Sequence, residues 1–220
     1  MFVLALDTCL AACSAAVLDG GRVLARRVEA MARGHQERLA PLVAEVMAEA
    51  DLAFDRLDRV GVTVGPGSFT GLRVGLAFAK GLGQALAIPV IGVGVLEALA
   101  EPFAAEPATV FAALEAKRGQ VYLQAFSGGA ALMAPDALAI EIAAARLLEL
   151  AGPGPTILVG TGAAHLAEAL PAARIVAADH AEPEAVARLA AIRPPVPPRP
   201  LYLRAPDAKL PGGRDLPAQA

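Results

Sequence analysis

Residues Val60–Ala87 read VGVTVGPGSFTGLRVGLAFAKGLGQALA, and this stretch decides the fold. Its opening run, Val60–Val64, is apolar and rich in β-branched side chains, which is typical of a buried strand. The next residues, Gly65–Ser68, predict a turn, because glycine tolerates positive φ and proline fixes its own φ. Ser68 is the predicted N-cap of a helix, since apolar residues recur after it at helical spacing. The stretch therefore predicts a strand, a glycine turn and a helix.

Such a unit often binds anions, because backbone N–H groups and the helix dipole point to one place. The specific motifs of this kind do not fit. A phosphate-binding P-loop requires lysine where Leu72 stands, and a nucleophile elbow requires glycine at Pro66 and Thr70. A dinucleotide-binding turn requires an acidic residue about 20 positions further on, and Leu86–Val95 contains none. On chemistry alone, the glycines favour tight packing of the helix on the strand.

Composition limits the classes of protein that the chain can belong to. With 220 residues, 56% of them hydrophobic, the chain can bury the cores of two lobes. No run reaches the roughly 18 uninterrupted apolar residues of a membrane span, since the closest, Gly81–Leu96, is interrupted by Gln84 and Pro89, and no signal peptide is apparent. Cys9 and Cys13 fit a reducing cytoplasm, so we expect a cytoplasmic protein without membrane contact. A net charge of −3 without a basic cluster does not predict RNA binding by this chain alone.

Periodicity and turn signals divide the chain into alternating strands and helices. In the first half, a β-meander is joined at Asp19–Gly21 by a strong hairpin signal. The predicted elements of this half are strands at Phe2–Leu6, Cys13–Leu18, Arg22–Glu29 and Ile88–Val93, and helices at His35–Ala50 and Val95–Ala105. In the second half they are strands at Thr109–Leu114, Gln120–Ser127, Thr156–Val159 and Arg174–Ala177, and helices at Ala137–Leu150, Ala163–Ala169 and Pro183–Ile192.

This alternation predicts an α/β protein of two lobes. Residues 1–104 are the predicted first lobe, and residues 105–192 are a smaller second lobe beyond a hinge at Pro102–Pro107. Residues 193–204 form a proline-rich return segment, whose strand at Leu201–Leu203 is expected to join or pack on the first lobe. Residues 205–220 are the predicted disordered tail.

The run Thr63–Gly75 resembles the signature of the TsaB (YeaZ) family. The segments Leu4–Thr8, Ala12–Val17, Leu114–Tyr122 and Pro200–Arg204 agree with it, so the resemblance spans nearly the whole chain. The middle segment departs mildly, since the family usually has Asp and Arg where Glu115 and Lys117 stand. Members of this family are the dimerisation subunits of the bacterial machinery that makes threonylcarbamoyladenosine on tRNA.

The resemblance implies a fold of two actin-like (ASKHA, ribonuclease H-like) lobes, each a mixed sheet with flanking helices. It implies a non-catalytic scaffold that binds the metal-bearing TsaD-type transferase and a TsaE-type ATPase, and that also forms a homodimer. The complex transfers threonylcarbamoyl to the tRNA adenosine beside the anticodon, and tRNA is reached only through the complex. The alternative is an enzyme in its own right, an ATP-dependent phosphotransferase using Asp7 or a peptidase.

The resemblance implies a degenerate nucleotide cleft, because actin-like proteins hold a nucleotide at the positions of Asp7, Thr8, Gly160 and Gly162. It also implies ATP or ADP at the interface of the complex. The other interpretation is that Asp7 and Thr8 only hydrogen-bond their turn. No catalytic residue or metal is assigned. In the related TsaD-type subunit an H-x-x-x-H helix binds the metal, and here Val95 and Leu99 occupy those positions.

The helices at His35–Ala50 and Ser68–Ala87 are expected to lie side by side and to present an apolar stripe to the partner. The predicted interface residues are Leu39, Leu42, Val46, Phe69, Leu72, Arg73 and Leu76. Periodicity leaves open which of them face the core of the lobe.

Overall fold

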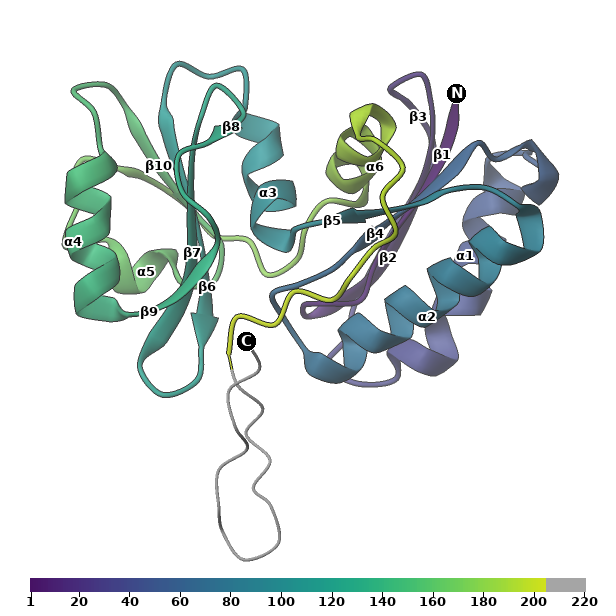
Figure 1. Ribbon diagram of the computed structural model, residues 1–220, viewed down its shortest axis with the longest axis horizontal. Helices are drawn as coiled ribbons and strands as arrows, with labels where there is room; N and C mark the ends of the chain where they lie inside the picture. The colour runs from purple at the N-terminus through teal and green to yellow at the C-terminus, as the bar shows by residue number, and fades with distance from the viewer. Residues whose placement is uncertain (205–220) are drawn as a thin grey trace, which may run out of the picture.

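Two mixed sheets, one in each lobe, form the framework of the computed structural model, which describes residues 1–204 (Figure 1). The first sheet has the strand order β3-β2-β1-β4-β5. The second has the order β11-β10-β6-β7-β8, with β9 also paired to β7. The predicted α/β fold of two lobes, each a mixed sheet with flanking helices, is therefore confirmed. The predicted tail at residues 205–220 lies outside the described residues.

The first sheet begins as the predicted β-meander. Gly20 and Gly21 have φ of 55° and 96°, so a two-residue turn joins β2 to β3 and pairs Asp19 with Arg22. Two further strands, β4 and β5, then lie parallel to β1. The strands of this sheet are β1 (Phe2–Asp7), β2 (Ala12–Asp19), β3 (Arg22–Ala30), β4 (Arg59–Thr63) and β5 (Val90–Val93).

Helices cover both faces of the first sheet. On one face α1 (His35–Glu49) packs on β2 and β3, and α2 (Phe69–Leu86) packs on β4 beside it. On the other face α6 (Pro183–Ile192) packs on β1, β2 and β4. Leu4 and Leu6 of β1 join the core under α1 and α2, while Val3 and Ala5 join the core under α6. Strand alternation therefore builds two separate apolar layers. A 3₁₀ turn at Phe54–Arg56 precedes β4.

The second lobe repeats the arrangement with fewer helices. Its core lies around Phe111, Leu123, Leu147 and Leu158. Between the lobes stand α3 (Val95–Ala100) and the 3₁₀ turn η2 (Glu101–Phe103). The strands are β6 (Thr109–Ala116), β7 (Gln120–Ser127), β8 (Ala130–Ala131), β9 (Asp136–Ala139), β10 (Thr156–Val159) and β11 (Arg174–Val176), and the helices are α4 (Ile140–Leu150) and α5 (Ala163–Leu166).

Some predicted boundaries are wrong. The helix predicted from Ala137 begins only at Ile140, because Asp136–Ala139 pairs with β7 as strand β9. The helix predicted to end at Ala105 ends at Ala100 and continues as the η2 turn. The helix predicted to end at Ala169 ends at Leu166. In each case, residues that helix propensity assigns to the end of a helix instead form a strand pair or a short turn.

Helix α6 follows the second lobe in the sequence but packs on the first sheet, so it does not finish the second lobe as predicted. Its sheet-facing side consists of small residues, and a Cβ at Gly61 of β4 would lie 2.7 Å from Ala190 Cβ. Gly61 and the alanines of α6 therefore allow a close approach that larger side chains would prevent.

The chain then runs back across the first lobe as residues 193–204, here named the C-terminal strap, drawn in yellow-green in Figure 1. Arg193 donates to the Gly92 carbonyl at 3.0 Å, and Pro198 is buried beside Gly92. Leu201 N–H donates to the Val64 carbonyl at 2.7 Å. The strap is extended, but residues 201–203 are not a strand, in contrast to the prediction.

Candidate functional site

The turn before α2 is fastened to the loop between β1 and β2. The Ser68 hydroxyl accepts a hydrogen bond from Gly71 N–H at 3.3 Å, which confirms the predicted N-cap. The Ser68 N–H donates to the Cys9 carbonyl at 2.7 Å, and the Thr8 hydroxyl donates to the Gly71 carbonyl at 2.7 Å. Three donors at this turn, Ser68 N–H, Gly71 N–H and the Thr8 hydroxyl, are thus engaged within the protein.

Three glycines make this contact possible. A Cβ would lie 2.3 Å from the Cys9 carbonyl oxygen at Gly67, 1.9 Å from the Thr8 carbonyl oxygen at Gly71, and 2.6 Å from the Thr8 hydroxyl at Gly75. No side chain fits at such distances. The interpretation of these glycines as packing residues is therefore confirmed.

Asp7 is fully buried at the end of β1. Its Oδ1 accepts from Cys9 N–H at 2.9 Å and from the Thr63 hydroxyl at 2.5 Å. Burial raises the pKa of the Asp7 carboxyl, although these hydrogen bonds and the nearby His180 and His35 oppose the rise. Its Oδ2 is buried without a hydrogen-bond partner among the described residues. Asp7 and Thr8 therefore do hydrogen-bond their own turn.

Gly160 and Gly162 hold the corresponding turn of the second lobe. Gly160 has φ of 109°, and its N–H donates to the Val176 carbonyl at 3.1 Å. Gly162 N–H donates to the Ala113 carbonyl at 2.9 Å, and a Cβ at Gly160 would lie 2.3 Å from that same oxygen. Both glycines thus serve close backbone packing as well as a turn.

A hollow of about 350 Å³ lies beside Gly160, lined mainly by alanines together with Ile175 and Asp179. The Asp179 carbonyl accepts a hydrogen bond from Ala11 N–H at 3.3 Å, so the β1–β2 loop reaches the segment that lines the hollow. The lining comes only from residues 160–179, and the buried Asp7 and Thr8 of the predicted nucleotide cleft do not contribute to it. That this cleft receives ATP or ADP stays a prediction.

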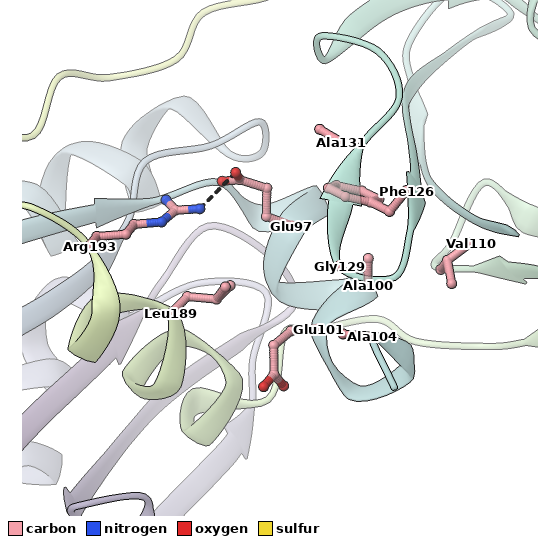
Figure 2. A pocket seen from close by; sticks show the side chains of 10 residues that line it. All are labelled: Glu97, Ala100, Glu101, Ala104, Val110, Phe126, Gly129, Ala131, Leu189 and Arg193. Atoms are coloured by element: carbon pink, nitrogen blue, oxygen red, sulfur yellow. Dashed lines mark hydrogen bonds and ion pairs between the residues drawn. The ribbon is translucent and has the colours of Figure 1, made fainter. Parts of the chain in front are cut away.

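A smaller hollow, of about 90 Å³, lies on the other side of the hinge, where α3 and α6 meet the second sheet (Figure 2). Two ion pairs flank it. Arg193 of the strap bonds Glu97 of α3 at 2.7 Å, as the dashed line shows, and Arg188 of α6 bonds both oxygens of Glu101 at 2.6 Å. These pairs tie α6 and the strap to the segment that links the lobes.

The helix that would carry metal ligands in a TsaD-type subunit is α3. Val95 and Leu99 are 0% and 4% exposed and lie in an apolar core that continues from the first lobe into the second. Within residues 1–204, no group of three or more His, Cys, Asp or Glu side chains is placed to hold a metal ion. Cys9 and Cys13 are both buried free thiols. No helix of this described part has the length and apolarity needed to cross a membrane.

The residues of the predicted partner interface fall into an exposed group and a buried group. Phe69 and Arg73 are exposed on α2, with 49% of the Phe69 surface accessible. The other five predicted interface residues lie on the sheet-facing side of the two helices and are at most 6% exposed, so they belong to the core and cannot contact a partner. These residues are Leu39, Leu42, Val46, Leu72 and Leu76. The large side chains go to the sheet because burial there removes most apolar area from water.

The outward side of the two helices, here named the outer helix face, is made of small residues. They recur at four-residue spacing on each helix and are all exposed: Ala40, Ala44 and Ala48 on α1, and Ala77, Gly81 and Ala85 on α2. Val74, Phe78 and Leu82 are half-buried beside them. Sequence reasoning missed this face, although its alanine spacing was visible.

At the N-terminal end of α2 the strap completes an aromatic cluster. The Arg73 guanidinium lies 3.7 Å from the centroid of the Phe69 ring, and the Phe69 and Tyr202 centroids are 5.5 Å apart. Arg73 Nε donates to the Tyr202 hydroxyl at 3.3 Å. These three residues are referred to below as the Phe69–Arg73–Tyr202 cluster.

Two lobes of this topology, each a mixed sheet with flanking helices, define an actin-like (ASKHA) fold. A hexokinase of the ROK type from Thermus thermophilus shares this fold, with a TM-score of 0.52 at 18% identity over 87% of this chain and 99% of that one. Within that class the chain belongs to the TsaB (YeaZ) family. The solved structure of YeaZ from Pseudomonas aeruginosa matches with a TM-score of 0.75 at 31% identity, over 86% of this chain and 90% of that one.

Two sequence comparisons agree with this assignment. The tRNA threonylcarbamoyladenosine biosynthesis protein TsaB of Escherichia coli is 36% identical over 124 residues, which cover 56% of this chain and 53% of that protein. The family model described as TsaD, tRNA N6-adenosine threonylcarbamoyltransferase, matches residues 23–168. The chain is thus similar both to TsaB proteins and to the transferase family.

Proposed function

We propose that this chain is a non-catalytic scaffold subunit of tRNA threonylcarbamoyladenosine biosynthesis. It binds a metal-bearing TsaD-type transferase and a TsaE-type ATPase, and so supports threonylcarbamoyl transfer to the tRNA adenosine beside the anticodon. In the absence of the transferase it pairs with a second copy of itself. The similarity to the Escherichia coli protein TsaB supports the pathway, and the match to the TsaD family supports a partner built on the same framework.

The observation that carries the proposal is the outer helix face. Six exposed small residues lie on these two neighbouring helices, and the half-buried side chains of Phe78, Val74 and Leu82 lie beside them. Small side chains let another helix pair approach closely, and an apolar surface of this kind gains stability when a partner covers it. Because a surface that fits a related fold also fits its own copy, self-pairing through the same face follows.

The non-catalytic role is supported by what the catalytic positions contain. Val95 and Leu99 are apolar core residues without a donor atom for a metal. Asp7, the residue on which the phosphotransferase alternative depends, is buried and bonded through Oδ1 to Thr63 and Cys9. The chemistry therefore belongs to the partner.

Light scattering tests the proposal. The full chain is measured alone, and then mixed with the TsaD-type subunit of the same organism. We expect a dimer that exchanges into a mixed complex, and we expect Ala44→Arg and Ala77→Arg to abolish that complex. Ala145→Arg is the matched control, because Ala145 is an exposed helical alanine of α4 in the other lobe. A wild-type chain that forms no complex with the transferase would contradict the proposal.

A further inference from the structure

We propose that the Phe69–Arg73–Tyr202 cluster is a docking anchor that receives a carboxylate of the protein partner, so that the docking surface continues from the helices onto the C-terminal strap. This inference rests on the proposed scaffold function. It adds that the C-terminal strap is part of the interface and that an acidic side chain of the partner binds to the cluster.

The strap holds Tyr202 in a fixed place. Leu201 N–H donates to the Val64 carbonyl, and the Leu201 carbonyl approaches so closely that a Cβ at Gly65 would lie 2.9 Å from it. Gly65 has φ of 105°, a conformation that glycine adopts without strain. Pro198 is buried a few residues earlier. Tyr202, although 47% exposed, is therefore anchored by the residues that precede it.

Arg73 is pre-organised for a ligand. Its guanidinium is stacked on Phe69, and its Nε is bonded to the Tyr202 hydroxyl, which fixes the orientation of the planar group. Within residues 1–204 it makes no ion pair, so its two terminal nitrogens remain available as donors. Paired N–H groups in this geometry match the two oxygens of a carboxylate. A guanidinium held in place loses little entropy when it binds.

The carboxylate has to come from outside these elements. From Arg59 to Leu96, and again from Ala185 to Arg204, the sequence contains no Asp or Glu. The same two stretches contain several arginines and a lysine. Arg188 and Arg193 are paired with Glu101 and Glu97, whereas Arg73 and Lys80 are exposed on α2 and form no ion pair within residues 1–204. An acidic patch on the partner is the complement of such a surface.

The surroundings favour a protein carboxylate over an RNA phosphate. The guanidinium at 3.7 Å already covers one face of the Phe69 ring, where a nucleobase would stack. Phe69, Arg73 and Ala77 follow one another at four-residue spacing, so the cluster continues directly into the small apolar residues of the outer helix face. An arginine with aromatic neighbours at the margin of an apolar surface is a common anchor in protein interfaces.

Calorimetric titration of the full chain with the TsaD-type subunit tests the inference at low and high salt. We expect Arg73→Glu to raise Kd about 30-fold or more, and Tyr202→Ala to raise it about 10-fold. Arg22→Glu is the matched control, since it makes the same change of charge at the exposed β2–β3 turn, off both helices, and should alter Kd less than about 3-fold. Thermal unfolding of each variant verifies that the fold is kept.

The possible outcomes separate the two proposals. If Arg73→Glu and Arg22→Glu weaken binding equally, or if neither does so while Ala77→Arg abolishes it, the anchor is wrong and the scaffold function stands. If Arg73→Glu leaves the protein complex unchanged but weakens tRNA binding to it, the ligand is a phosphate and the inference is overturned. If the wild-type chain does not bind the transferase at all, the scaffold function fails and the anchor fails with it.

Discussion

The Thr8 hydroxyl donates a 2.7 Å hydrogen bond to the Gly71 carbonyl, and a Cβ at Gly71 would lie only 1.9 Å from the Thr8 carbonyl oxygen. Two segments that lie 63 residues apart in sequence are therefore in direct backbone contact. The end of β1 and the start of α2 form one packed unit, and this contact explains the glycine pattern of Thr63–Gly75 without a bound anion.

Gly71→Ala should therefore be severely destabilising. The new methyl group meets backbone that cannot move without separating α2 from the β1–β2 loop, so we expect a loss of about 3 kcal/mol or more in the free energy of unfolding. Gly81→Ala in the same helix meets no atom within 4 Å. It should raise stability by about 0.5–1 kcal/mol through helix propensity. Urea unfolding measures both, and equal stability of the two variants would contradict the packing argument.

The sequence predicted the strand–turn–helix unit because its signals are local. The β-branched run, the glycine turn and the Ser68 cap each depend on a few neighbouring residues, and all three lie in one stretch. The faces of α1 and α2 were harder to predict. Periodicity marks Leu42 and Leu72 as an apolar stripe but does not say whether a sheet or a partner covers it. Only the tertiary structure shows that the sheet does, and that the alanines remain outside.

The place of α6 could not be predicted for a similar reason. Its sequence position favours the second lobe, since consecutive elements usually pack together. The contact that allows α6 to pack on the first sheet is between Ala190 and Gly61, which lie far apart in the chain. The Phe69–Arg73–Tyr202 cluster also depends on such a long-range contact. Candidate sites built from distant segments therefore need the structure, whereas turns and caps do not.

Leu42→Ala should reduce stability and leave docking unchanged. Leu42 is fully buried under the first sheet, so its truncation should cost about 2–5 kcal/mol in unfolding free energy. Phe69→Ala is the contrasting variant, because Phe69 is half exposed. It should cost less than about 1 kcal/mol in stability and should weaken partner binding. Unfolding curves and titrations on both variants check this, and a Leu42→Ala chain that is stable but fails to bind would reverse the assignment.

Asp7→Asn should change the pH dependence of stability. Burial raises the pKa of Asp7 in the folded chain above its ordinary value of 3.8, so between 3.8 and the folded pKa the folded state binds more protons than the unfolded state. The contribution of Asp7 to stability is thus present below pH 3.8 and is lost as pH rises through the folded pKa. An amide keeps Oδ1 as the acceptor for Cys9 and Thr63 and carries no charge.

We therefore expect Asp7→Asn to gain stability relative to the wild type at pH 7, and to gain less at pH 4. Urea midpoints at both values measure the difference. Thr63→Val is the comparison, because it leaves the Asp7 carboxyl but removes a hydrogen bond that lowers its pKa, and so should extend the loss of stability to higher pH. A loss of stability in Asp7→Asn that is equal at the two pH values would show that the Asp7 charge is not the cause.

The ion pair between Arg188 and Glu101 should stabilise the contact between α6 and the hinge. Both oxygens of Glu101 are bonded at 2.6 Å, and the Glu101 side chain is 17% exposed, so solvent screens the pair only in part. Glu101→Gln should cost about 1–2 kcal/mol, since a charge-assisted pair is replaced by a weaker hydrogen bond. Glu149→Gln is the matched control, because Glu149 pairs with Arg146 on an exposed side of α4 and should contribute almost nothing to stability.

Hydrogen exchange locates the effect of Glu101→Gln. Amide exchange in α6 should become faster, because this ion pair holds α6 against the hinge, while amide exchange in β1 should stay slow. Uniform acceleration through the whole first lobe would instead mean that the pair supports global folding and not the attachment of α6.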